Sequence, residues 1–114
     1  MITIFEVLAD PTRRRILDLL REQPRLVGEL TALLQISQPG VSKQLRLLRE
    51  AGLVTVRQEA QRHWYELRPE PLAELDAWLN PYRQYAEARY DRLENLLNEL
   101  QEKENNHEQD DAGG

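Results

Sequence analysis

Apolar residues recur at three- and four-residue steps in four short stretches near the start of the chain, which is the spacing of one helix face. Start and stop signals delimit these stretches. Thr3 and Glu6 form a capping box, and Asp10 precedes a proline at the first helical position. The pattern predicts helices over residues 4–8, 11–22, 27–35 and 38–50.

The fourth stretch carries its own start and stop signals. Ser37 is a favourable N-cap, and Gly52 stands where a left-handed residue ends a helix. Val41, Leu45 and Leu48 share one face, which predicts a buried stripe. The opposite face is polar and basic, with Gln38, Ser42, Lys43, Arg46 and Arg49. A solvated surface helix can have this composition, but the segments on both sides favour a helix that lies in a DNA major groove.

After Gly52 the periodicity changes from helical to alternating. Residues 54–57 and 63–67 are β-prone runs connected by residues 58–62, which predicts a hairpin. With the short link between the third and fourth helices, this gives a helix-turn-helix followed by a wing. Basic residues at a wing tip can reach phosphates or the minor groove, whereas in an ordinary polar loop they are merely solvated. The candidates are Arg57, Arg62 and His63.

The C-terminal part predicts a partner helix. A proline-rich break at residues 69–71 precedes a helix expected over residues 72–80, which Pro81 bends or restarts. Residues 82–100 continue an apolar stripe that has no remaining core to cover. A second helix, most simply from an identical chain, would bury it. Residues 102–114 are polar and acidic, which predicts a disordered tail.

Charge is unevenly distributed along the 114 residues, a length typical of one domain. The net charge is −5, but residues 37–68 hold 6 Lys and Arg against 3 Asp and Glu, whereas residues 71–114 hold 4 against 11. Because charges are screened beyond about 8–10 Å at physiological salt, the basic middle can bind nucleic acid despite the acidic total. No secretion signal or membrane span is expected, and the absence of cysteine fits a cytoplasmic protein.

These stretches resemble the ArsR-type (ArsR/SmtB) family of bacterial winged helix-turn-helix repressors. The likeness rests on residues 7–17, 27–30 and 37–54, and it extends over about residues 4–97. It implies a mainly α fold with a small β-hairpin, in which four helices, the hairpin and a long fifth helix follow one another. It also implies a dimer formed through the terminal helices.

The resemblance therefore predicts one winged helix-turn-helix domain over residues 1–101, with dimerisation segments at residues 1–9 and 71–101. The expected interface residues are Ile4, Phe5, Leu75, Leu79, Tyr82, Ala86, Leu93, Leu96 and Leu100.

This chain departs from the metal-sensing members of that family. Those members place Cys-x-Cys near the start of the third helix, where this chain has Leu26 and Gly28. Its two histidines, His63 and His107, are too few for a four-ligand site. We therefore predict no metal and no cofactor. Leu26 also stands where a capping Ser or Thr would open the third helix.

The favoured hypothesis is a homodimeric repressor that occupies a near-palindromic operator in double-stranded DNA. Base-edge contacts are expected from Gln38, Ser42, Lys43 and Arg46. Ser37, Gly40 and Arg49 are expected near the DNA backbone, Gly40 because it has no side chain to hold the phosphates off.

Other functions have weaker support in the sequence. The acidic C-terminal helix could instead serve a protein-interaction module. No Gly-rich phosphate loop is present, and Glu87, Asp91 and Glu94 fit a solvated helix flank better than a catalytic site. An effector could bind among the aromatic residues of the terminal helix, although aromatic residues at helical spacing are more often core. The sequence identifies no such effector, and no membrane partner is expected.

Overall fold

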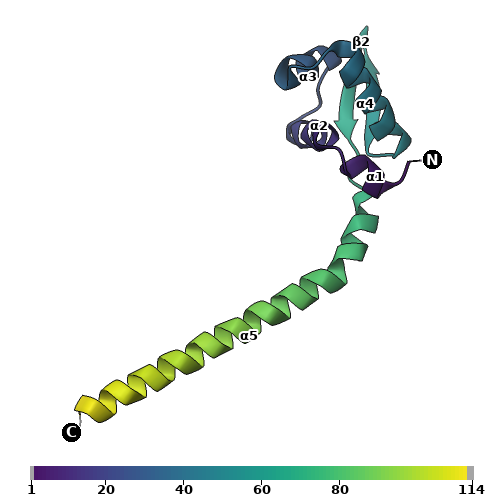
Figure 1. Ribbon diagram of the computed structural model, residues 1–114. Coiled ribbons are helices and arrows are strands. Elements are labelled where there is room, and N and C mark those ends of the chain that lie inside the picture. Colours follow the sequence, from purple (N-terminus) through teal and green to yellow (C-terminus); the bar gives the residue numbers. More distant parts are fainter. Residues whose placement is uncertain (1, 113–114) are drawn as a thin grey trace. The chain divides into compact units, whose positions relative to one another are not determined.

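The computed structural model describes the backbone of residues 2–112 and the side chains of residues 2–106. Seven elements follow one another within these residues (Figure 1). They are α1 (Ile4–Leu8), α2 (Pro11–Glu22), α3 (Val27–Leu34), α4 (Gln38–Glu50), β1 (Val54–Glu59), β2 (Arg62–Leu67) and α5 (Leu72–Ala112). The predicted mainly α fold with a hairpin wing is confirmed.

Contacts divide the chain into two units, Met1–Ala77 and Trp78–Gly114. We call the first the winged-helix unit, and we call residues 78–112 of α5 the distal helix. The sequence predicts one domain over residues 1–101. The division falls earlier because the core ends with the first turns of α5. Within the described residues, no helix is both long and apolar enough to cross a membrane.

One hydrophobic core holds the winged-helix unit together. Its buried residues come from all four N-terminal helices and from the start of the wing. They are Ile4, Val7, Ile16, Leu17, Leu20, Leu30, Leu34, Val41, Leu45, Leu48, Leu53 and Val54. The partly buried Leu67 and Leu72 also pack against this core. The core therefore joins the wing and the first turn of α5 to the helices.

The predicted helix ends are confirmed in atomic detail. The side chains of Thr3, Asp10 and Ser37 each accept a backbone N–H in the first turn of the helix that follows. Gly52 has φ of +78°, and its N–H donates to the carbonyl of Arg49 at 3.0 Å. The N–H of Leu53 donates back to Leu48 at 3.0 Å, which completes a Schellman ending. Leu26 makes no side-chain cap, as expected.

Two arginines of α2 close the end of α1, which the sequence did not predict. Arg13 donates to the carbonyls of Val7 (2.7 Å) and Glu6 (3.1 Å), and Arg14 donates to that of Leu8 (2.6 Å). Arg13 also donates to Gln44 Oε1 on α4 at 3.0 Å. These hydrogen bonds supply donors to carbonyl groups at the end of α1 that have no donor within the short helix. The arginines therefore serve the fold, and Arg13 also forms an ion pair with Asp10 at 3.4 Å.

The backbone at Arg25 pairs with the hairpin as a third, single-residue segment. Its backbone forms an antiparallel bridge with Tyr65, with N–O distances of 3.0 and 2.8 Å. Its side chain is buried and donates to the carbonyl of Leu19 at 3.1 Å and to Glu22 at 2.8 Å. No pattern in the sequence predicts this bridge, since a single extended residue has no periodicity.

The wing is longer than predicted. β1 pairs with β2 from Val54 opposite Leu67 to Glu59 opposite Arg62, which leaves two residues to turn the chain instead of five. The first of these, Ala60, adopts φ of +57°. The alternation of apolar residues in the sequence ends before the pairing of β1 with β2 does, because the strands of an exposed hairpin can also pair at polar residues.

α5 does not restart at Pro81, and residues 102–112 of the expected disordered tail are helical. α5 runs without interruption from Leu72 to Ala112 and contains Pro81. One missing N–H donor weakens a long helix without ending it. Residues 102–112 continue the helix, and their Glu, Gln and Lys residues are good helix formers. The last two residues of the predicted tail lie outside the described residues.

Substitution of Gly52 tests the left-handed ending of α4, and substitution of Gly28 in α3 is the control. Gly52→Ala is expected to lower the free energy of unfolding by about 1–2 kcal/mol, because an L-residue is strained at φ of +78°. Gly28→Ala, in a helix with no atom within 4 Å of the new Cβ, should raise it by about 0.5–1 kcal/mol. Chemical denaturation of both variants measures this, and a Gly52→Ala protein as stable as wild type would contradict the prediction.

Candidate nucleic-acid interface

The outward face of α4 presents the predicted polar side chains to solvent. Burial of Val41, Leu45 and Leu48 in the core turns the other side of the helix outward. Ser37 Oγ accepts the N–H of Gly40 at 3.3 Å, which fixes where the helix starts. The exposed residues are Ser37, Gln38, Ser42, Lys43, Arg46 and Arg49. The structure thus brings all of the predicted base-contacting residues onto one surface.

The cations of this surface have no ion-pair partner among the described side chains. Within residues 2–106, ion pairs involve Arg13, Arg25 and Arg57, but none involves Lys43 or Arg46. Solvent-exposed cations without an ion-pair partner on the outer face of a helix are suited to phosphate and base-edge acceptors.

Gly40 has a packing role that the sequence did not predict. A Cβ at this position would lie 2.9 Å from Ile36 Cγ2 and 3.2 Å from Ser37 Oγ. Glycine is therefore required because the link from α3 passes close to the first turn of α4.

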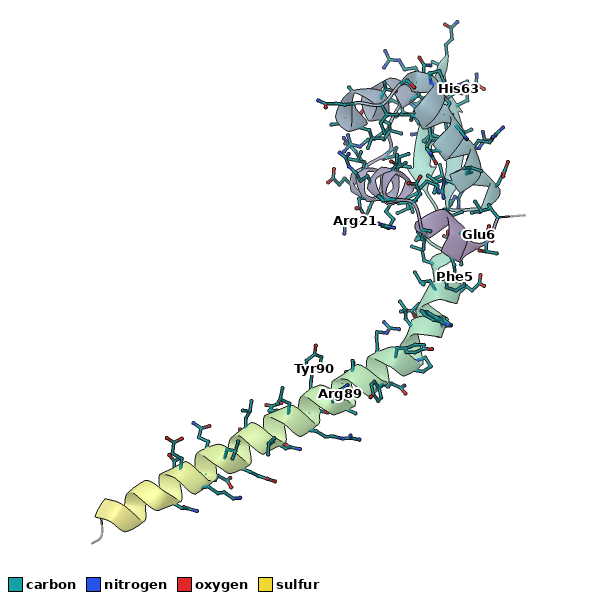
Figure 2. The ribbon with its side chains drawn as sticks, viewed as in Figure 1. Phe5, Glu6, Arg21, His63, Arg89 and Tyr90 are labelled. Carbon is teal, nitrogen blue, oxygen red and sulfur yellow. The ribbon has the colours of Figure 1, made fainter. Side chains whose placement is uncertain are left out.

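The three basic wing residues are not equivalent. Arg57 donates to Glu66 Oε1 at 2.6 Å and also to Glu59, and these hydrogen bonds, Glu66 first, raise the pKa of its guanidinium. Two carboxylates thus already compensate the charge of Arg57. Arg62 and His63 are exposed, and Arg62 makes no ion pair within the described side chains. Figure 2 shows His63 at the end of the winged-helix unit remote from Phe5 and Glu6 of α1.

The predicted interface residues differ in burial. Ile4 is only 5% exposed and belongs to the core of the winged-helix unit. Phe5 is 42% exposed, and Leu75 is half-buried. Of the remaining predicted interface residues in α5, Ala86 is half-buried. The others are exposed, namely Leu79, Tyr82, Leu93, Leu96 and Leu100.

No metal-binding cluster is found in the described part of the chain. Among its His, Cys, Asp and Glu residues, no three or more lie together in a way that could hold an ion.

Comparison with known proteins agrees with this geometry. The family model for "Bacterial regulatory protein, arsR family" matches residues 10–56, which include α2 to α4 and the start of β1. The arsenic resistance transcriptional regulator ArsR1 of Pseudomonas putida is 44% identical over 77 residues, which cover 67% of this chain and 60% of that protein. The transcriptional repressor SdpR of Bacillus subtilis is 32% identical over 79 residues, which cover 69% of this chain and 88% of SdpR.

Solved structures give the same result. The crystal structure of an ArsR family transcriptional regulator aligns with a TM-score of 0.64 at 30% identity, covering 74% of this chain and 87% of that one. A possible transcriptional regulator for arsenical resistance aligns with a TM-score of 0.61 at 42% identity, covering 68% of this chain and 80% of that one. These relatives are transcriptional regulators and not enzymes.

The close approach at Gly40 is testable by substitution. Gly40→Ala is expected to lower the free energy of unfolding by about 1–3 kcal/mol, since Ile36 is branched at Cβ and cannot easily move its methyl group. Ser42→Ala, an exposed change in the next turn, should stay within about 0.5 kcal/mol of wild type. Chemical denaturation would refute the packing role if both variants unfolded like wild type.

Proposed function

The chain belongs to the arsR family of bacterial regulatory proteins and is a DNA-binding transcriptional regulator, and we propose that it acts as a homodimeric repressor on a near-palindromic operator. The observation that carries the proposal is the exposed face of α4, whose Lys43 and Arg46 make no ion pair within residues 2–106. Two such faces related by a two-fold axis would read half-sites about 10 bp apart.

We assign base-edge contacts to the exposed polar residues of α4. Gln38 is suited to the donor and acceptor of adenine, and Arg46 to the two acceptors of guanine. Ser42 and Lys43 complete this set. Ser37 and Arg49 lie toward the ends of the helix face, where contacts to the DNA backbone are expected.

The wing adds contacts mainly through Arg62 and His63. Both side chains are exposed in the described structure. Arg57 is a weaker candidate than the sequence indicates, because Glu59 and Glu66 already hold it. The guanidinium of Arg57 would have to give up its hydrogen bonds to these two glutamates in order to contact a phosphate.

Dimerisation is supported by apolar surface that the described chain leaves uncovered. An open hollow of about 510 Å³ lies between α1, α2 and the first turns of α5, with Phe5, Leu17 and Leu75 among its lining residues. Exposed leucines continue along the distal helix. Exposed apolar areas of this kind mark interaction sites, and a second copy is the simplest occupant.

DNA binding by the wild-type protein tests the proposal directly. If the dimer neutralises about eight phosphates, log K should fall with log salt at a slope near −7. Arg46→Ala should weaken specific binding by about 1–3 kcal/mol. Arg21→Ala, which removes an exposed charge from the last turn of α2, is the matched control and should bind within twofold of wild type, or about 0.4 kcal/mol.

Gel-shift titrations on genomic fragments selected by the purified protein measure these values. Unchanged affinity of the Arg46→Ala protein would remove Arg46 from the contact surface. Failure of the wild-type protein to retain any duplex DNA would reject the proposed function and favour a protein-interaction role.

The carboxylates around Arg57 give a second test. Glu66→Gln is expected to strengthen DNA binding about two- to fivefold and to steepen the salt slope by about 1–2, because it removes the negative charge from one of the two partners of Arg57 on each wing. Glu6→Gln makes the same chemical change on α1, remote from the wing (Figure 2), and should leave both values unchanged. Weaker binding by the Glu66→Gln protein would show that Glu66 orients the wing for DNA.

A further inference from the structure

The guanidinium of Arg13 connects three helices. Arg13 belongs to α2, and its side chain is only 14% exposed. Nε donates to the carbonyl of Val7 at 2.7 Å and Nη2 donates to that of Glu6 at 3.1 Å, so two donors hold the end of α1. Nη1 donates to Oε1 of Gln44 on α4 at 3.0 Å. Because the guanidinium is a rigid planar group, its position on α1 determines where it meets α4.

Asp10 holds the same guanidinium from the start of α2. Its Oδ2 lies 3.4 Å from Nη1 of Arg13, and its Oδ1 accepts the N–H of Thr12 at 3.2 Å. The carboxylate is thus itself fixed by the backbone of α2. With partners at the end of α1 and at the N-cap of α2, the guanidinium has little freedom to turn. Arg13 therefore offers α4 a fixed hydrogen-bond donor.

Gln44 receives this donor at the edge of the buried stripe of α4. At about 100° per residue, Gln44 lies about 60° from Val41 around the helix and about 100° from Lys43. Its side chain is half-buried, whereas Val41 is fully buried and Lys43 is exposed. The hydrogen bond from Arg13 therefore holds α4 beside its apolar contacts, one residue away from the exposed polar surface.

Such a bond controls how far α4 can rotate about its own axis. Burial of the apolar stripe decides which side of the helix faces outward, but apolar contacts have little directional preference. A rotation of about 10° moves groups about 6 Å from the axis by about 1 Å. That shift is enough to lose a hydrogen bond to a base edge, since such bonds need a narrow range of distance and angle. A directional bond at Gln44 restricts this rotation.

We propose that Arg13 is a positioning residue for DNA recognition, which acts through Gln44 to set the rotation of α4 and with it the places of Lys43 and Arg46. The guanidinium itself is already bound on α1 and α4 and does not touch DNA. This role rests on the proposed function and adds to it a residue outside the contact surface. Loss of the link impairs contacts that read bases, whereas phosphate contacts, which follow charge, persist.

Two substitutions of Gln44 separate this role from a direct contact with DNA. Gln44→Met keeps the length of the side chain but removes the acceptor. The ratio of operator affinity to affinity for an unrelated duplex should then fall about three- to tenfold, while affinity for the unrelated duplex stays within about twofold because no charge changes. Gln44→Glu keeps an acceptor for Arg13. Its negative charge should weaken both affinities, but their ratio should stay within about twofold of wild type.

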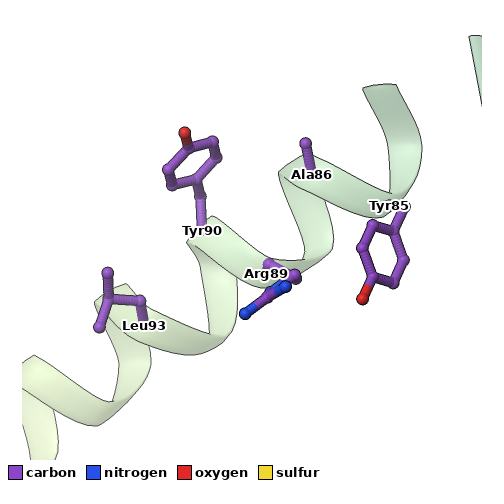
Figure 3. A pocket seen from close by; sticks show the side chains of 5 residues that line it. All are labelled: Tyr85, Ala86, Arg89, Tyr90 and Leu93. Atoms are coloured by element: carbon purple, nitrogen blue, oxygen red, sulfur yellow. The ribbon is translucent and has the colours of Figure 1, made fainter. Parts of the chain in front are cut away.

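A substitution of Arg13 tests the other end of the link. Arg13→Lys keeps the charge but not the planar fork, and it should lower the ratio at least as much as Gln44→Met does. Adding Gln44→Met to the Arg13→Lys protein should cause no further loss, because both changes break one link. Arg89→Lys is the matched control. Its guanidinium lies 5.8 Å from the centre of the Tyr85 ring on the distal helix (Figure 3), and the ratio should not change.

Gel-shift titrations at one salt concentration measure both affinities, on variants that circular dichroism shows to be folded. An unchanged ratio for Gln44→Met, in a wild-type protein that binds its operator, would overturn the positioning role and leave the proposed function intact. Equal loss of the ratio in Gln44→Met and Gln44→Glu would also overturn it and show that Gln44 contacts DNA. These two variants decide the matter even if Arg13→Lys does not fold. A wild-type protein that binds no duplex would reject both proposals.

Discussion

The packing of Val41, Leu45 and Leu48 into the core decides what this molecule can present to a partner. Burial of these three side chains fixes the orientation of α4 about its axis. Its opposite side therefore exposes Gln38 and the basic residues to solvent. Ser37 fixes where the helix begins, and the left-handed Gly52 fixes where it ends. The polar surface is therefore a consequence of apolar burial and of two backbone caps.

Arginines that look alike in the sequence have separate tasks in the folded chain. Arg13 closes α1 and reaches α4, and Arg25 ties the hairpin to the helices from a buried position. Arg57 is held by two carboxylates on its own wing. Arg46 keeps its charge free of any partner within residues 2–106, which is what an anionic ligand requires. Charge counts along the chain cannot separate these cases, because pairing depends on distance in space.

α5 combines two physical environments in one helix. Its first turns contribute Leu72 to the core of the winged-helix unit, whereas its distal part exposes leucines and tyrosines along one side. A continuous helix can cross from one environment to the other because its backbone hydrogen bonds are internal, and Pro81 removes only one of them. In the proposed function, the winged-helix unit binds DNA and the exposed side of the distal helix binds a second copy.

Local features of the chain determined most of the fold. Helix caps at Thr3, Asp10 and Ser37, the glycine after α4 and the spacing of apolar residues are properties of a few neighbouring residues, so they could be recognised from the sequence alone. The polar face of α4 followed from the same spacing. Contacts between distant residues were decided by the tertiary structure: the bridge from Arg25 to Tyr65, the pairing of Arg57 with Glu66, the burial of Ile4 and the close approach of Ile36 to Gly40. Each of these depends on where the folded backbone places two residues, and no periodicity in the sequence records that distance.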